Sequence, residues 1–221
     1  MSIRRAGQRL VVLDLDGTIT KSDTLIPFLA GCFVRYPRLR LGLLLLPMYL
    51  LRFVASLISA TEFKERLLTA FVGGLRVSSV ESWARKFARR VIDSGCNSEV
   101  LSFIERSQAR GDRLIVVSAS PDIYVPLIAG NLGIGETVST RAEVNAGRYT
   151  GRLLGENCKG AEKLRRLKEY LEATRCESMA IAVGDEDSDL PVLEWADEGW
   201  MVTAGRMSLR ASRAASCVEQ V

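Results

Sequence analysis

The sequence predicts an α/β fold, in which a mainly parallel sheet is covered by helices and interrupted by an inserted, all-helical cap. Short apolar runs at Leu10–Leu13, Leu114–Val117 and Met179–Val183 are typical of buried parallel strands. Helical patterns alternate with the second and third runs, as in successive strand–helix units. Residues 22–105 break this alternation and show helical patterns only, which indicates an insertion after the first strand.

The order of these runs defines the expected domains. Residues 1–21 and 106–221 form the core, and residues 22–105 form the cap, which contains an unusually apolar segment at 41–60. A fourth apolar run, Trp200–Thr203, is a candidate for a further strand of the core.

The remaining elements follow from periodicity and turn residues. A stretch rich in Gly, Thr and Arg, Glu136–Asn157, is typical of a short β-hairpin. No repeat or low-complexity linker interrupts the pattern. Helices are expected at Ser98–Arg110, Asp122–Leu132, Gly160–Ala173 and Leu190–Asp197.

The composition narrows the chemistry. The 221 residues include no histidine, which excludes Ser-His-Asp and Cys-His sites and any zinc site built on imidazole. Five scattered cysteines without a CxxC pattern argue against a disulfide framework and favour a reducing cytoplasm. The balance of 30 basic and 26 acidic residues is mild, and the arginine clusters do not alternate with aromatics, so nucleic-acid binding has little support.

Polar loops follow the three main strands. They read Asp14-Leu15-Asp16-Gly17-Thr18, Ser118-Ala119-Ser120 and Gly184-Asp185 with Asp189 one helical turn later. The carboxyl ends of parallel strands meet at one edge, so these loops can converge on one site. Paired carboxylates suit a hard cation such as Mg²⁺, which would bridge to substrate phosphate oxygens. Without histidine, aspartate is the natural nucleophile, because it can form an aspartyl-phosphate.

In these motifs the chain resembles the haloacid dehalogenase superfamily, and within it the subclass IB phosphatases typified by phosphoserine phosphatase. The resemblance rests on the Asp14–Thr18 motif, Ser118, a lysine near 159–163 and the Gly184–Asp189 motif, in the same order. It implies a Rossmann-like core. Transport ATPases carry a lysine after the nucleophile, where this chain has Leu15, and dehalogenases lack the second aspartate, Asp16.

The resemblance also implies roles for individual residues. Asp14 would be the nucleophile, and Asp16 would protonate the leaving oxygen and then activate water. Ser118 and the Ala119 amide would bind the phosphate, with Thr18 and Ser188 as further candidates from the first and fourth motifs. The Mg²⁺ ligands would be Asp14, the backbone carbonyl of Asp16 and Asp185, supported by Asp189.

The lysine of the third motif is ambiguous, because Lys159 and Lys163 lie four positions apart and would share a helix face. In phosphoserine phosphatases a Lys-Gly lysine is functional, which favours Lys159. In lipid-phosphatase-like relatives a Cys-x-Gly-x-x-Lys pattern favours Lys163. We slightly favour Lys159, and either lysine could instead belong to the solvated surface.

Two cap residues are loose candidates for substrate recognition. Asp23 lies nine residues after the nucleophile, where phosphoserine phosphatases carry a glutamate that binds the substrate amine. Arg66 could take the place of a cap arginine that binds the substrate carboxylate. The alternatives are equally good: Asp23 as the N-cap of a helix and Arg66 as a solvated helix residue.

The segment 41–60 is long and apolar enough to resemble a membrane span, with Arg52 its one charge. A single crossing would separate Asp14 from the rest of the site, so a hairpin lying on the membrane through residues 24–60 is the better interpretation. Phosphatidylglycerophosphatase-like relatives have a similar layout. The alternative is a well-packed cap or dimer interface.

The sequence therefore predicts a Mg²⁺-dependent phosphomonoesterase that acts on a membrane lipid phosphate or a small phosphorylated metabolite. It would be cytoplasmic, and if its substrate is a lipid phosphate it would attach peripherally to the inner face of the membrane. The rival interpretations are a phosphoserine phosphatase without membrane contact and a catalytically inactive, membrane-docked interaction protein.

Overall fold

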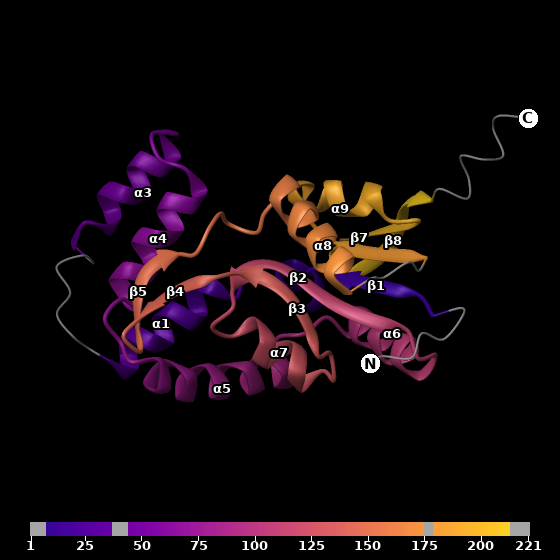
Figure 1. Cartoon of the computed structure of the whole chain (residues 1–221), viewed down its shortest axis with the longest axis horizontal. Coiled ribbons are helices and arrows are strands. Elements are labelled where there is room, and N and C mark those ends of the chain that lie inside the picture. The colour runs from indigo at the N-terminus through magenta and orange to yellow at the C-terminus, as the bar shows by residue number, and fades with distance from the viewer. Residues whose placement is uncertain (1–7, 37–43, 175–178, 213–221) are drawn as a thin grey trace, which may run out of the picture.

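The computed structural model describes residues 8–36, 44–174 and 179–212. Its centre is a six-stranded sheet in the order β3-β2-β1-β6-β7-β8, parallel except for β8, which pairs antiparallel with β7 (Figure 1). The strands are β1 (Leu10–Leu13), β2 (Arg113–Pro121), β3 (Glu136–Thr140), β6 (Ala180–Gly184), β7 (Glu198–Thr203) and β8 (Arg206–Ser212).

The register of the central strands aligns the predicted motifs. Leu13, the last residue of β1, pairs with Val116 of β2 on one side and with Val183 of β6 on the other. Asp14, Ser118 and Asp185 therefore lie at one edge of the sheet, beyond the level where β1 ends. Strand β2 itself continues to Pro121, past the end at Val117 that the apolar run predicts, because Ser118 and Pro121 still pair with β3.

Helices cover both faces of the sheet because the side chains of β1 alternate between two buried clusters. Val11 and Leu13 belong to the cluster that contains residues of α6 (Ser98–Ala109) and α7 (Val125–Asn131). Leu10 and Val12 belong to the cluster that contains residues of α8 (Ala161–Thr174) and α9 (Leu190–Trp195). The mainly parallel sheet with flanking helices confirms the predicted α/β class.

A second lobe lies beside the sheet in Figure 1. Its helices are α1 (Leu25–Arg35), α3 (Leu46–Val54), α4 (Ala60–Phe71) and α5 (Val77–Ser94). A two-stranded hairpin, β4 (Ala142–Asn145) and β5 (Arg148–Leu153), packs on α4 and belongs spatially to this lobe.

Two details differ from the sequence prediction. The hairpin spans only 142–153, because the residues of β3 join the main sheet beside β2 instead of turning back on the chain. The antiparallel strand β8 was not expected, since Arg206–Ser212 is polar and shows no apolar run.

The predicted division into core and cap stays a prediction. The packing leads us to propose two changes to it. Helix α6 contacts β2 and β8 and so belongs with the core, whereas the β4–β5 hairpin belongs with the cap. Within 8–36, 44–174 and 179–212, no helix has both the length and the apolar character that crossing a bilayer requires. Residues 41–43 of the apolar segment lie outside the described part.

Candidate active site

The first motif turns sharply after β1 because of one glycine. Residues Leu15–Ile19 form a tight turn in which Gly17 has a φ of +82°, a left-handed conformation that favours glycine. A Cβ atom at Gly17 would lie 2.0 Å from Oδ2 of Asp185. The glycine therefore lets the first motif approach the fourth, and Oγ1 of Thr18 donates to Oδ1 of Asp185 at 2.9 Å.

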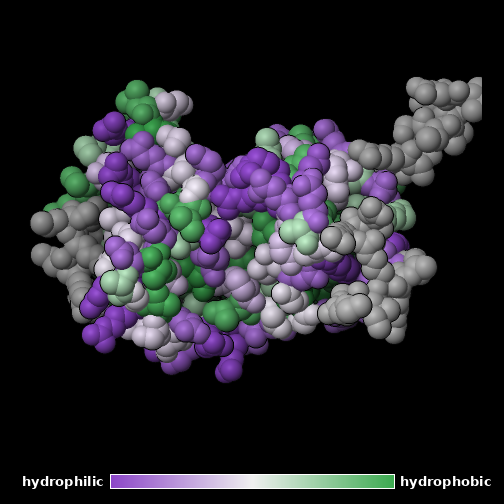
Figure 2. All heavy atoms as spheres, in the orientation of Figure 1, coloured by the Kyte–Doolittle hydropathy of each residue, from purple (hydrophilic) through white to green (hydrophobic). Residues whose placement is uncertain are grey.

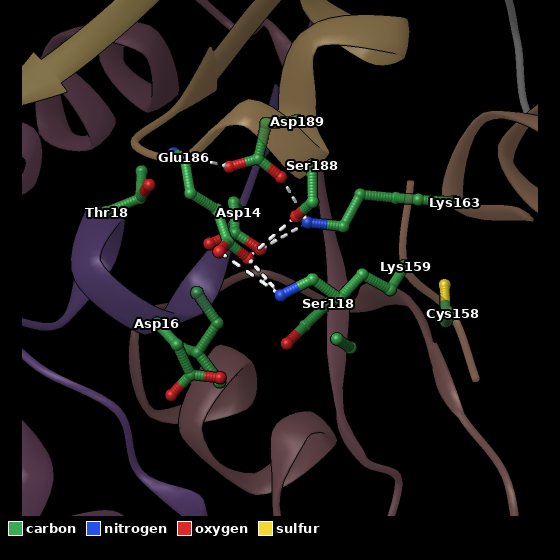
Figure 3. Close-up of polar contacts among 12 residues, drawn as sticks. Asp14, Asp16, Thr18, Ser118, Cys158, Lys159, Lys163, Glu186, Ser188 and Asp189 are labelled. Carbon is green, nitrogen blue, oxygen red and sulfur yellow. Dashed lines mark hydrogen bonds and ion pairs between the residues drawn. The ribbon is translucent and has the colours of Figure 1, made fainter. Parts of the chain in front are cut away.

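Lys163 joins the first and fourth motifs at the centre of the site (Figure 3). Its Nζ lies 2.6 Å from Oδ1 of Asp14 and 2.6 Å from Oδ1 of Asp189. The lysine side chain is 3% exposed, so these contacts are shielded from solvent. Helix α8 brings Lys163 to the carboxyl end of β1 by packing Leu167 and Leu171 on the sheet.

The electrostatics follow from this burial. Burial raises the pKa of Asp14 to about 8 despite the lowering influence of Lys163, and the charges of Asp189 and Asp16 raise it further. Burial alone would lower the pKa of Lys163, but Asp14 and Asp189 raise it above its ordinary value. One cation thus faces several carboxylates, which leaves an excess of negative charge.

Three carboxylates in this region form a candidate metal centre. Asp14, Asp185 and Asp189 each offer an oxygen, and these oxygens lie within 4.8 Å of one another. Burial raises the pKa of Asp185 as well, against the lowering influence of Thr18. An all-oxygen donor set with excess negative charge fits Mg²⁺. Asp189 also accepts from the backbone N–H of Asp185 at 3.1 Å, which braces the loop.

Asp16 is held by hydroxyl groups, apart from Lys163. Its Oδ1 accepts from the backbone N–H and Oγ1 of Thr24, at 2.7 and 2.6 Å, and its Oδ2 accepts from Oγ of Ser120 at 2.6 Å. Figure 3 shows its carboxylate turned away from the Asp14–Lys163–Asp189 cluster. Burial raises the pKa of Asp16, and the hydrogen bonds from Ser120 and Thr24 lower it in part.

The second motif lies beside these groups. Ser118 is fully buried, and its Oγ accepts from the backbone N–H of Ser120 at 3.0 Å. The last residues of β2 therefore include the predicted phosphate-binding Ser118 and Ala119 and the partner of Asp16, Ser120.

Other predicted residues lie farther from the carboxylates. Lys159 pairs with Glu186 at 3.0 Å and is 44% exposed, and Ser188 donates to the same glutamate at 2.7 Å. The geometry therefore favours Lys163 as the lysine of the third motif, against our sequence preference for Lys159. Ser188 is half-buried, whereas Asp189 is buried.

The two cap candidates have structural partners instead. Oδ1 of Asp23 accepts from the backbone N–H of Leu25 at 2.9 Å, at the start of α1, as the helix-cap alternative expects. Arg66 pairs with Glu62 at 3.1 Å and lies over the ring of Tyr49. Among the described residues, neither side chain has a hydrogen bond or ion pair with the motif residues, although the charge of Asp23 contributes to raising the pKa of Asp16.

No pattern in the sequence points to Lys64, which contacts a motif residue from the cap, as Thr24 also does. Its Nζ donates to the carbonyl oxygen of Ala119 and to Oδ1 of Asn157, each at 2.7 Å. Burial lowers its pKa to about 8. One lysine among the charges of an amphipathic helix carries no distinguishing pattern; only the fold brings it to the second motif.

Comparisons with known proteins agree with this geometry. The family model of haloacid dehalogenase-like hydrolases matches residues 11–194. Protein CicA of Caulobacter vibrioides is 32% identical over 202 residues, covering 89% of this chain and 87% of CicA.

Two solved structures share the fold. A protein of unknown function from Bordetella pertussis has a TM-score of 0.74 at 21% identity, covering 97% of this chain and 96% of that one. A substrate-bound phosphoserine phosphatase has a TM-score of 0.60 at 19% identity, covering 89% and 86%. With the family model spanning all four motifs, this chain belongs to the haloacid dehalogenase-like hydrolase family, as its sequence predicts.

Proposed function

We propose that the protein is a Mg²⁺-dependent phosphomonoester hydrolase that works through an aspartyl-phosphate on Asp14. The observation that carries this proposal is the 2.6 Å contact of Lys163 with Asp14 inside a group of three carboxylates. Such a site places a nucleophile, a fixed cation and a set of hard oxygen ligands around one point, as phosphoryl transfer requires.

The proposed reaction has two steps. An oxygen of Asp14 attacks phosphorus while the bond to the leaving oxygen breaks, and Asp16 donates a proton to that oxygen. Water then attacks the phosphorus of the aspartyl-phosphate, Asp16 accepts its proton, and the bond to Asp14 breaks to release inorganic phosphate. Lys163 keeps Asp14 oriented through both steps.

The phosphate and the metal have separate binding groups in this proposal. The Ser118 hydroxyl and the Ala119 amide donate to phosphate oxygens. Asp14, the carbonyl of Asp16 and Asp185 would hold Mg²⁺, with Asp189 bracing them. The ion would supply positive charge to the phosphate oxygens.

The test is hydrolysis of p-nitrophenyl phosphate with Mg²⁺ and with EDTA. We expect Asp14→Asn to abolish turnover, whereas Glu172→Gln, at an exposed position of α8, keeps wild-type activity. Turnover by Asp14→Asn at more than a few per cent of wild type would exclude Asp14 as the nucleophile.

A specific observation favours a lipid phosphate as the substrate, with phosphoserine as the alternative. Helix α3 buries no side chain, and large apolar residues are exposed on and around α1 and α3. We call the exposed apolar residues on and next to α3 the apolar face: Leu44, Leu45, Met48, Leu50, Leu51, Val54 and Leu57. Figure 2 shows green atoms at the tip of the cap over α3.

The charge of the sequence segment that contains this apolar face indicates which partner it binds. Residues 24–61 contain four arginines and no acidic residue. A second copy would bring the same positive charge, whereas an anionic bilayer offers both apolar depth and opposite charge. We therefore propose that the apolar face docks on the cytoplasmic surface of an anionic membrane, next to the helix that carries Lys64.

Flotation with phosphatidylglycerol-containing vesicles tests this docking. Changing Leu50, Leu51 and Val54 to serine should abolish binding. The matched control changes Val144, Leu154 and Leu209 to serine. These residues lie outside the apolar face, are 47%, 48% and 51% exposed, and their variant should bind like wild type. Equal binding by both triple variants, or none by wild type, contradicts the membrane proposal.

Substrate choice is tested separately with phosphatidylglycerophosphate in vesicles and with phosphoserine. A lipid phosphate substrate is supported if kcat/KM is higher for the lipid than for phosphoserine and this preference is lost in the Leu50, Leu51 and Val54 variant. A higher kcat/KM for phosphoserine in both proteins supports the small-metabolite alternative.

A further inference from the structure

The carboxylate of Asp16 uses its two oxygens unequally. Oδ1 accepts two hydrogen bonds, from the backbone N–H and the hydroxyl of Thr24. Oδ2 accepts one, from the hydroxyl of Ser120. Each carboxylate oxygen has two lone pairs. The Thr24 hydroxyl also lies 3.1 Å from the Tyr124 hydroxyl, and when its one hydrogen points to Oδ1, the shorter contact, Oδ1 is saturated and Oδ2 keeps one acceptor position. Oδ2 is therefore the oxygen that can exchange a proton with a reacting group.

Ser120, which contacts this oxygen, is itself oriented by Tyr124. The Tyr124 hydroxyl donates to Oγ of Ser120 at 2.9 Å. A serine that accepts a hydrogen bond in a confined space directs its own proton elsewhere, and the carboxylate at 2.6 Å is its acceptor here. Ser120 is 3% exposed and Tyr124 is fully buried, so bulk water does not compete for these bonds.

The ring of Tyr124 is fixed by its neighbours. It packs against Phe28 at a centroid distance of 4.6 Å and against Phe87 at 5.5 Å. Tyr124 stands at the start of α7, whereas both phenylalanines belong to cap helices. The hydroxyl therefore has a defined position that Tyr124→Phe would remove without removing the ring.

We propose that Tyr124 and Ser120 are positioning residues for proton transfer by Asp16, a role that rests on the general acid step proposed above. Tyr124 orients the Ser120 hydroxyl, and Ser120 holds Oδ2 of Asp16 toward the leaving oxygen. As the bond from phosphorus to the leaving oxygen breaks and the bond to Asp14 forms, the proton on Asp16 passes to that oxygen. Thr24 anchors the opposite oxygen, Oδ1.

The test exploits the leaving group. p-Nitrophenolate departs without protonation, whereas an alkoxide needs a proton, so loss of positioning slows alkyl esters selectively. Values of kcat/KM for p-nitrophenyl, phenyl and ethyl phosphate report the steps up to leaving-group release. For Tyr124→Phe we expect a decrease of about tenfold or more with ethyl phosphate and less than about twofold with p-nitrophenyl phosphate.

Further variants separate positioning from folding. Ser120→Ala should steepen the leaving-group dependence of kcat/KM further. Ser120→Thr keeps a hydroxyl, so its leaving-group dependence should be close to that of wild type. Tyr170→Phe is the matched control, because Tyr170 donates to Glu136 away from the motif residues. In an Asp16→Asn background, Tyr124→Phe should not change the leaving-group dependence of kcat/KM any further.

Each contrary outcome has a distinct meaning. An equal decrease for all three esters, or no decrease, in a folded Tyr124→Phe protein overturns the positioning role. An unchanged leaving-group dependence in Asp16→Asn instead overturns the general acid step of the proposed function. No hydrolysis by the wild type overturns both.

Discussion

The ammonium of Lys163 lies 2.6 Å from a carboxylate oxygen of Asp14, although 149 positions separate the two residues. The contact is possible because β1 ends beside the N-terminal turn of α8, where Lys163 projects inward. It joins the first motif to the third and partly neutralises a buried carboxylate. An aspartate that must both bind a cation and attack phosphorus needs such a fixed partner.

The first prediction concerns the two lysines. Lys163→Gln should lower kcat for p-nitrophenyl phosphate by about 100-fold or more, because a buried charged hydrogen bond to the nucleophile is lost. Lys159→Gln should cost much less, since Lys159 pairs at the surface with Glu186. Lys168→Gln, at an exposed position of α8, is the control. A larger loss for Lys159→Gln than for Lys163→Gln would return the role to Lys159.

The second prediction concerns Gly17. Gly17→Ala should abolish both turnover and Mg²⁺ binding, because the new Cβ would meet Oδ2 of Asp185 at 2.0 Å. Gly74→Ala is a matched control: Gly74 has a φ of +77° with no atom within 4 Å of its Cβ position. Both variants carry a backbone strain of about 1–2 kcal/mol, so only the clash distinguishes them. Calorimetric Mg²⁺ titration of both variants measures the difference.

The strands and motifs could be predicted from the sequence because each depends on local patterns. Buried runs such as Leu10–Leu13 are continuous in apolar residues, and acids or serines directly follow the carboxyl ends of these runs. Strand β8 was missed since it is polar and depends on its neighbour β7 for pairing.

The part of the site that was not predicted depends on contacts between distant segments. The choice between Lys159 and Lys163 requires the direction in which α8 faces the sheet. Lys64 belongs to the amphipathic helix α4, Tyr124 directly precedes α7, and only packing brings the two side chains to Ala119 and Ser120. Hydrophobic periodicity predicts which face of a helix or strand a residue lies on, but it does not predict which residue it will contact.

The third prediction concerns Lys64 and pH. Its pKa of about 8 in the folded protein lies below the ordinary value, so between pH 8 and about 10 the unfolded chain binds more protons. Stability should therefore rise with pH in this window, and the cost of burying the charge is fully present below pH 8. Lys64→Met should remove this rise and raise the melting temperature at pH 7.

A control and a contrary outcome complete the test. Lys86→Met, at an exposed position of α5, should keep the wild-type pH dependence of melting. After Lys64→Met, the Thr140 hydroxyl lies within hydrogen-bond distance of both Ala119 O and Asn157 Oδ1, and it can donate its one hydrogen to either of them. A decrease of stability at pH 7 beyond about 1 kcal/mol would show that the lysine contacts outweigh the cost of burial.

The fourth prediction concerns the metal. Asp14, Asp185 and Asp189 together carry more negative charge than Lys163 neutralises, so a divalent cation should relieve their repulsion. At a Mg²⁺ concentration 100 times its Kd, the free energy of unfolding should rise by about 2.7 kcal/mol. For a chain of this length that corresponds to about 5–10 °C in melting temperature. Thermal scans with Mg²⁺, with EDTA and with Na⁺ at equal ionic strength measure this shift.

Asp185→Asn separates this effect from general salt screening. It removes one ligand and one repelling charge, so the variant should melt at a higher temperature than wild type in EDTA and gain little from Mg²⁺. Glu194→Gln, an exposed acid on α9, should show the wild-type increase. The opposite pattern, a full Mg²⁺ shift in Asp185→Asn, would place the cation away from the three carboxylates. The stabilisation of the unliganded protein by Asp185→Asn would also mean that the acidic cluster lowers stability, which is expected of residues retained for binding and chemistry.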